Sequence, residues 1–99
     1  MRGEPKFASF FLKLGDRQLK KRIDEVLNTL KEHPDSGDLV ERSLWPDEYK
    51  GLALDNLFRM EVGREQRLTY TIKIEGDNLD VDVIEFFRTH KEYEKRFHY

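Results

Sequence analysis

The stretch LFRMEVGREQRLTYTIKI, residues 57–74, decides the fold of this chain. Apolar and polar side chains alternate on both sides of its central GREQ segment, residues 63–66. A period of two is the pattern of a β-strand with one buried face. A short polar segment that contains glycine is typical of a hairpin turn. The stretch therefore predicts two antiparallel strands, at residues 57–62 and 67–74.

A third strand follows directly. EGDN, residues 75–78, has the composition of a hairpin turn, and LDVDVIEFF, residues 79–87, is apolar enough for a buried strand. Three consecutive strands with short turns predict an antiparallel meander. We expect one apolar face and one polar face, the latter carrying Arg59, Glu61, Arg67, Thr69, Thr71 and Lys73.

Two helices are predicted before the sheet, because apolar residues recur there at helical spacing. The first stripe is Phe7, Phe10, Phe11 and Leu14, and the second is Leu19, Ile23, Val26, Leu27 and Leu30. Gly15–Asp16 separates the two, with Asp16 as a good N-cap, and His33–Pro34 ends the second helix. The pair forms an α-hairpin that needs the apolar face of a sheet to bury its stripes.

Residues 34–56 show no clear period and predict an irregular connection. Trp45 and Tyr49 are interpreted as plugs at the edge of the core, with recognition aromatics as the alternative. After the third strand, Thr89 and Glu92 have the spacing of a capping box, which predicts a helix over 90–97. Tyr93 and Phe97 lie four residues apart and should dock this helix onto the protein body.

The fold class predicted is α+β: an N-terminal α-hairpin on one face of a small antiparallel meander, with a short C-terminal helix. Its length of 99 residues suits one domain, residues 1–99. There is no cysteine and no histidine pair at metal-binding spacing, so we expect no metal and no thiol chemistry. No apolar run reaches the ~18 residues of a membrane span, which favours a cytoplasmic protein.

Charge is unevenly distributed along the chain, whose formal net charge is −2. Residues 1–22 carry +5 and residues 88–99 carry +2, whereas residues 23–63 carry −6 and 64–87 carry −3. Basic termini that meet in space would form a phosphate-binding surface. Alternating charges on solvated helix faces explain the same pattern equally well.

The order of these segments resembles the RelE/ParE superfamily of toxins from toxin–antitoxin modules, over residues 16–97. NLFRMEVGREQRLTYTI, residues 56–72, and HKEY, residues 90–93, carry the resemblance. It implies a RelE-like fold and an endoribonuclease without metal or cofactor. Such an enzyme cleaves messenger RNA, usually on the ribosome, by attack of the 2′-OH on the neighbouring phosphate. The resemblance also implies a cognate antitoxin partner, in a heterotetramer.

This chemistry needs a base, an acid and cations around the phosphate. Arg59 and Arg67 share a sheet face on neighbouring strands, so both guanidiniums are expected to hold one phosphate; salt bridges with Glu61 or Glu85 are the alternative. His90 is the best acid or base, because an imidazole titrates near neutral pH. Its alternative is an ordinary first-turn helix residue.

Five further residues complete the predicted site. Lys91 stands where relatives often carry an arginine that stabilises the transition state. Tyr93 would supply a phenol or stack a base, unless it only docks the helix. Glu85 would be the base or orient Arg67. Arg88 and Lys73 are the expected additional RNA phosphate-binding residues.

A non-catalytic module of the same fold is the alternative function. It would be ParE-like and act on DNA gyrase, or serve only to bind an antitoxin. Leu57, Ile84 and Phe86 would line a groove for such a partner if the third strand is incompletely covered, and otherwise belong to the core. The polar set Arg59, Arg67, His90 and Tyr93 favours the nuclease.

Overall fold

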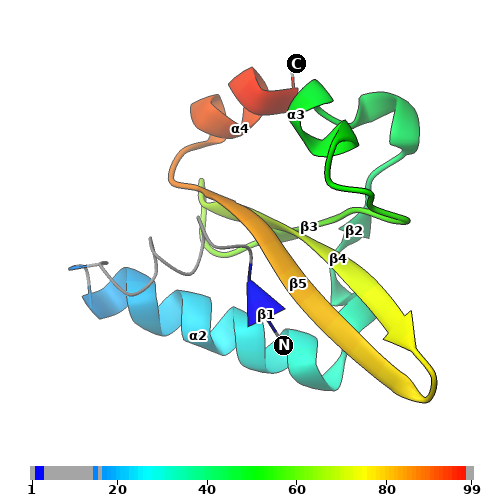
Figure 1. Ribbon diagram of the computed structural model, residues 1–99. Helices are drawn as coiled ribbons and strands as arrows, with labels where there is room; N and C mark the ends of the chain where they lie inside the picture. Colours follow the sequence, from blue (N-terminus) through cyan, green and yellow to red (C-terminus); the bar gives the residue numbers. More distant parts are fainter. Residues whose placement is uncertain (1, 4–14, 16, 98–99) are drawn as a thin grey trace.

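The computed structural model describes residues 2–3, 15 and 17–97 of the chain. A long helix lies against one face of a β-sheet, and short helices lie against the other (Figure 1). The elements are β1 (Arg2–Gly3), α2 (Arg17–Glu32), η1 (Pro34–Ser36), β2 (Asp38–Leu39), η2 (Arg42–Leu44), α3 (Asp47–Lys50), β3 (Phe58–Glu61), β4 (Arg67–Glu75), β5 (Asn78–Phe87) and α4 (His90–Phe97). The α+β class is confirmed. The predicted helix over residues 7–14 and the Asp16 cap lie outside the described residues.

Helix α2 forms over the predicted stripe. Leu19, Ile23 and Leu30 are buried and pack with the sheet residues Leu68, Tyr70, Val81 and Val83. The helix ends at Glu32 because Pro34 disfavours helical backbone at the residue before it, and His33 has φ −134°. The first core of the protein therefore lies between α2 and one face of the sheet.

The sheet has the strand order β1-β5-β4-β3-β2. β3, β4 and β5 follow one another in the chain, and each pairs antiparallel with the next, so the predicted meander is confirmed. Two short edge strands were not predicted: β2 pairs antiparallel with β3, and β1 pairs parallel with β5. The turn between β4 and β5 consists of Gly76 and Asp77, and Gly76 has a φ of +61°, which suits glycine at this turn position.

A β-bulge interrupts the alternation in β5. Thr69 pairs with Glu85 and the next residue, Tyr70, pairs with Val83, which leaves Ile84 as an extra residue. As a result Ile84 joins the core on the second face, while Glu85 hydrogen-bonds to Tyr49 on that same face. A strict period of two therefore fails at this point of the strand.

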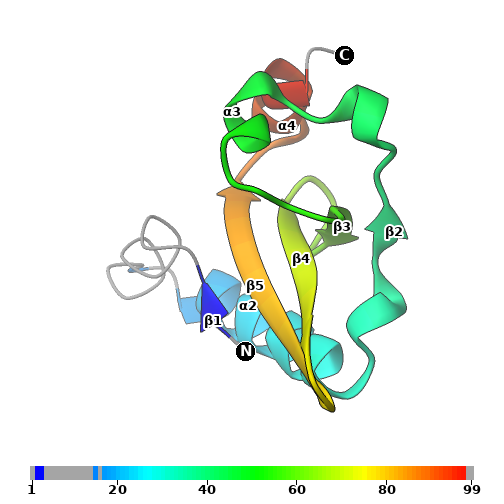
Figure 2. The ribbon, with the colours of Figure 1, turned by 45° about the vertical axis from the view of Figure 1, so that its right-hand side comes forward.

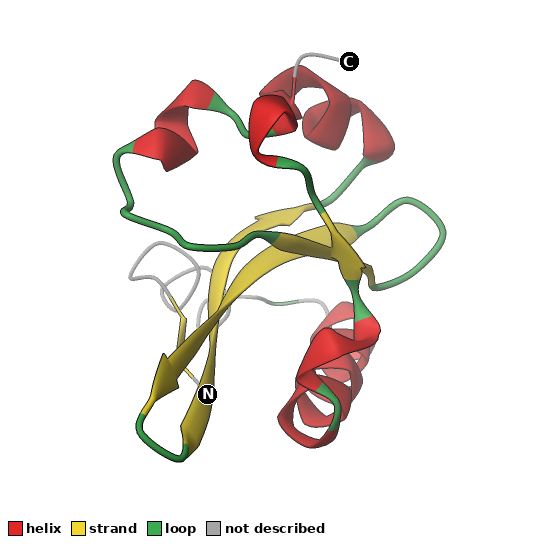
Figure 3. Cartoon of the chain, turned by 90° about the vertical axis from the view of Figure 1, so that its right-hand side faces the viewer, coloured by secondary structure: helices red, strands yellow, loops and turns green. Residues whose placement is uncertain are grey.

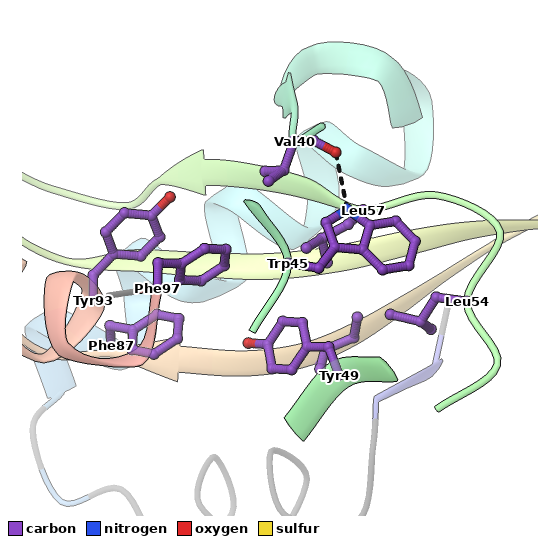
Figure 4. Packing of buried hydrophobic residues seen from close by; sticks show 9 residues of the cluster. Val40, Trp45, Tyr49, Leu54, Leu57, Phe87, Tyr93 and Phe97 are labelled. Carbon is purple, nitrogen blue, oxygen red and sulfur yellow. Dashed lines mark hydrogen bonds between the residues drawn. The ribbon is translucent and has the colours of Figure 1, made fainter. Parts of the chain in front are cut away.

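The second face of the sheet is not the open polar face that the sequence predicted. Thr69 and Thr71 are fully buried there. Residues 40–57 and α4 cover this face and build a second core (Figures 2 and 4). Its members are Val40, Trp45, Tyr49, Leu54, Leu57, Ile84, Phe87, Tyr93 and Phe97. The prediction failed because the apolar residues of the irregular connection have no period that reveals which face they cover.

Several apolar residues that the sequence assigned either to the core or to a binding surface belong to the core. Trp45 and Tyr49 are core residues, as interpreted, and the Trp45 indole donates to the Val40 carbonyl at 3.0 Å (Figure 4). Leu57 and Ile84 are buried in the second core, and Phe86 packs against the first. Core, rather than an open groove, is therefore the confirmed interpretation of Leu57, Ile84 and Phe86.

Asn56 extends the β-ladder with its side chain. Its Oδ1 accepts hydrogen bonds from the Ile72 backbone N–H and the Thr71 hydroxyl, both at 2.8 Å. Its Nδ2 donates to the Ile72 carbonyl at 2.9 Å. The amide thus replaces one residue of a neighbouring strand at the point where β3 no longer accompanies β4.

Candidate functional site

Helix α4 lies on the second face of the sheet, and two residues separate it from the end of β5. The Thr89 hydroxyl accepts from the Glu92 N–H at 3.1 Å, and the Glu92 carboxylate accepts from the Arg88 N–H at 3.0 Å. This is the predicted capping arrangement, with the carboxylate reaching one residue further back than in the usual box. Tyr93 and Phe97 are buried and stack at 4.5 Å between ring centroids, so the predicted docking is confirmed.

Two arginines approach the ring of Tyr93. The Cζ of Arg59, on β3, lies 5.9 Å from the ring centroid, and the Cζ of Arg67, on β4, lies 5.7 Å from it. Arg59 also donates from Nη1 to the Tyr93 hydroxyl at 3.1 Å. Both distances are within the range of cation–π contacts. Alternation along the two strands places both guanidiniums on the second face, as the sequence predicted.

His90 joins the same group from the first turn of α4. Its ring lies 6.3 Å from the Tyr93 ring with an interplanar angle of 21°. The His90 Nε2 contacts the Glu94 Oε1 at 2.7 Å, one turn along the helix. We call Arg59, Arg67, His90 and Tyr93 the Tyr93 cluster. It brings two permanent cations and an imidazole together around one buried phenol.

Arg67 is the most enclosed cation of the Tyr93 cluster, with 15% of its side chain exposed. Its Nη1 is buried and has no hydrogen-bond acceptor among the described residues. The Glu61 Oε1 lies 3.6 Å from its Nη2, which is longer than a charge-assisted hydrogen bond of about 2.7–2.9 Å. Part of the donor capacity of this guanidinium is therefore not used by the described residues.

Arg59 has a similar loose ion pair. Its Nε lies 3.7 Å from the Asp38 Oδ2, and 39% of its side chain is exposed. Asp38 belongs to the short edge strand β2, which pairs with β3 at Arg59 itself. The acid partners of the two arginines thus lie at the periphery of the cluster, where water weakens the attraction.

The structure places Glu85 in a separate network. Its carboxylate accepts from the Arg96 Nη2 at 2.9 Å and from the Tyr49 hydroxyl at 2.7 Å. Arg96 also pairs with Glu48 at 3.2 Å, so the network joins β5, α3 and α4. Burial raises the pKa of Tyr49, and the hydrogen bonds that Arg96 donates to the Glu85 carboxylate raise the pKa of Arg96. Glu85 therefore anchors α4 and bonds to Arg96 rather than to Arg67.

The other three predicted residues also lie apart from the Tyr93 cluster. Lys73 pairs with Asp82 at 3.0 Å, six residues along β4 from Arg67, or about 20 Å of strand. Arg88 is exposed in the link between β5 and α4, and Lys91 is exposed on α4. Of the eight predicted site residues, the structure brings together only Arg59, Arg67, His90 and Tyr93.

Sequence reasoning missed the residues that hold the site in place. Arg96 and Tyr49 fix α4 through Glu85, and Asn56 completes the ladder beside β4. The position of Arg96, three residues after Tyr93, was a signal that it belongs near the same helix face. Nothing in the sequence around Asn56 distinguished it from an ordinary loop asparagine.

No group of three or more His, Asp or Glu side chains within the described residues is arranged to hold a metal ion. None of the helices described has the length and apolar character needed to cross a membrane.

Comparisons with protein-family models, with curated proteins and with solved structures found no match to this chain.

Proposed function

We propose that this chain is a metal-free endoribonuclease with a RelE-like fold, acting on messenger RNA as the toxin of a toxin–antitoxin pair. The observation that carries the proposal is the convergence of Arg59, Arg67 and His90 around Tyr93. Two guanidiniums and an imidazole are the groups that phosphodiester cleavage without a metal requires. The fold class and the resemblance of residues 56–72 to RelE/ParE toxins support it further.

In the proposed reaction, the ribose 2′-oxygen attacks the adjacent phosphorus, and the bond to the 5′-oxygen of the next nucleotide breaks. The products are a 2′,3′-cyclic phosphate and a free 5′-OH. Arg67 and Arg59 neutralise the charge on the pentacoordinate phosphate. His90 accepts the proton of the attacking 2′-OH, water protonates the departing 5′-oxygen, and Glu94 orients the imidazole ring. Tyr93 is a positioning residue that holds Arg59.

The proposed partners follow from the same function. Messenger RNA, bound on the ribosome in the cytoplasm, is the substrate. A cognate antitoxin, in a heterotetramer with this chain, would cover the Tyr93 cluster and silence the enzyme. No cofactor takes part.

A ribosome-programmed mRNA cleavage assay tests the proposal. Wild type should cut at specific sites, whereas Arg67→Ala and His90→Ala should lose at least about 100-fold in rate, as expected for loss of charge stabilisation or acid–base catalysis. Lys31→Ala is the matched control, because Lys31 is an exposed cation at the end of α2 on the opposite side of the sheet. Far-UV circular dichroism checks the folding of each variant. A wild type that is inactive under all ribosome conditions contradicts the proposal.

A non-catalytic module is the second candidate, and one observation favours it. Tyr93 is fully buried, and its hydroxyl is hydrogen-bonded to Arg59, so it cannot stack a base without movement of its neighbours. In that case the cluster would serve to bind a partner, either DNA gyrase or an antitoxin. Inhibition of gyrase supercoiling by the chain, combined with no RNA cleavage, would select this function.

A further inference from the structure

The far end of the β4–β5 hairpin extends away from α2 and from the helices on the other face (Figure 3). β3 accompanies β4 only from Arg67 to Tyr70, and β1 accompanies β5 only at Asp82 and Val83. Ile74 and Leu79 face each other across the hairpin, with 73% and 57% of their surfaces exposed. Two large apolar side chains thus stand in solvent at a place where no other described strand lies alongside.

The backbone groups of Ile74 point toward the open edge of β4. Asn56 bonds both the N–H and the C=O of Ile72, so these groups of Ile72 point away from β5. Along a strand, the N–H and C=O groups of successive residues point alternately to one neighbouring strand and to the other. Ile74 lies two residues after Ile72. Its N–H and C=O therefore point in the same outward direction as those of Ile72. Asn56 occupies the preceding position of the edge, and among the described residues nothing occupies this one.

We propose that two copies of this chain associate through this edge, with β4 pairing antiparallel to β4 of the second copy about a two-fold axis at Ile74. In such a pair, Ile74 exchanges two backbone hydrogen bonds with its own equivalent. On one face the two Ile74 side chains meet, each flanked by its own Leu79. This contact removes from water the two Ile74 side chains, each of which is 73% exposed in the single chain.

The charges beside Ile74 fit this pairing. A two-fold axis at Ile74 sets Lys73 of each copy opposite Glu75 of the other, because positions opposite each other are then equidistant from Ile74. Opposite charges in directly facing positions stabilise antiparallel strands, whereas like charges destabilise them. The sequence Lys73-Ile74-Glu75 is therefore self-complementary for this register, and a shift by one residue would lose the match. Since the paired segment is short, the association should be weak.

Sedimentation equilibrium tests the proposal directly. The average mass of the wild type should rise above the chain mass of 11.9 kDa with concentration. Glu75→Lys should abolish the rise, because it sets Lys73 opposite another lysine. Lys73→Glu should do the same, and an equimolar mixture of the two variants should associate again, since every facing pair is then opposite in charge. A wild type that stays monomeric up to about 1 mM overturns the proposal.

A cysteine cross-link gives a second test. Unlike Lys73→Glu, it leaves the ion pair between Lys73 and Asp82 intact. The chain contains no cysteine, so Ile74→Cys introduces a single thiol, whose Cα would lie about 5.5 Å from its equivalent, within disulfide range. Leu79→Cys is the matched control, because three strand spacings, about 14 Å, would separate its equivalents. Ile74→Cys should form a disulfide-linked dimer on mild oxidation and Leu79→Cys should not. Equal cross-linking of both variants would mean random collision and overturn the proposal.

Discussion

The surroundings of Arg67 do little to stabilise its positive charge. Its side chain is mostly buried, its Nη1 has no acceptor among the described residues, and its one ion pair is 3.6 Å long. A buried donor without an acceptor costs roughly 1–3 kcal/mol. The contact with the Tyr93 ring returns only about 0.5–2 kcal/mol. This balance of free energies is weak for a purely structural residue, and under the proposed function the guanidinium would bind an anion.

Replacement of Arg67 by methionine separates the two interpretations. We expect Arg67→Met to leave the free energy of unfolding unchanged or to raise it by about 1 kcal/mol, because an apolar side chain of similar length needs no acceptor. Cleavage of mRNA should be lost in the same variant. Urea denaturation followed by circular dichroism measures the first effect.

Arg96→Met is the control for this prediction. Arg96 makes a bidentate contact with the Glu85 carboxylate. Loss of this contact in Arg96→Met should lower the free energy of unfolding by about 1–3 kcal/mol. If Arg67→Met destabilised the protein as much as Arg96→Met, the guanidinium of Arg67 would be a structural group and the anion-binding interpretation would be wrong.

At the scale of secondary structure, periodic segments were predictable and the irregular segment was not. Helices α2 and α4 and strands β3, β4 and β5 follow stripes or alternation that the sequence displays. β1 and β2 are two residues long, too short for any period. The Ile84 bulge and the cover over the second face depend on contacts between distant parts of the chain. The convergence of Arg59 and Arg67 was predictable because both lie on one face of adjacent strands, but the diversion of Glu85 to Arg96 was not.

The connection into β2 depends on a glycine in close contact with the sheet. The Gly37 N–H donates to the Tyr70 hydroxyl at 2.9 Å, and that hydroxyl donates to the Pro34 carbonyl at 2.7 Å. A Cβ added at Gly37 would lie 2.5 Å from the Arg59 carbonyl oxygen and 2.6 Å from the Tyr70 hydroxyl. Only glycine therefore lets this segment approach β3 and β4.

We expect Gly37→Ala to lower the free energy of unfolding by about 1–3 kcal/mol, because β2 or the Tyr70 ring must shift. Gly51→Ala is the control: its Cβ would meet nothing within 4 Å and its φ is −80°. That variant should be neutral or more stable by up to about 1 kcal/mol. Thermal unfolding of the two variants gives the comparison, and equal stability of both would show that the segment moves freely.

At the scale of the whole molecule, the sheet separates two cores, and a buried tyrosine hydroxyl lies on each side of it. Tyr70 belongs to the core under α2, and Tyr49 belongs to the core under α4. Burial raises the pKa of both phenols above the ordinary value near 10. The folded state therefore keeps two protons that the unfolded chain releases in alkaline solution.

Stability should consequently fall as the pH rises above about 10. The unfolded state binds fewer protons than the folded state in that range, so the free energy of unfolding decreases with pH, by up to about 1.4 kcal/mol per pH unit for Tyr49. Urea denaturation between pH 8 and pH 11 measures the slope, and Tyr49→Phe should make it shallower. A slope unaffected by Tyr49→Phe would show that this phenol ionises in the folded protein.

The two cores also determine which parts of the molecule can open separately. Local openings in proteins follow cooperative units, each with its own free energy. Residues 40–57 and α4 pack through the second core, whereas α2 packs through the first, so we expect the second layer to open while α2 keeps its contacts with β4 and β5. Because His90 and Tyr93 belong to α4, such an opening would separate them from Arg59 and Arg67, and the Tyr93 cluster would exist only while the second core is closed.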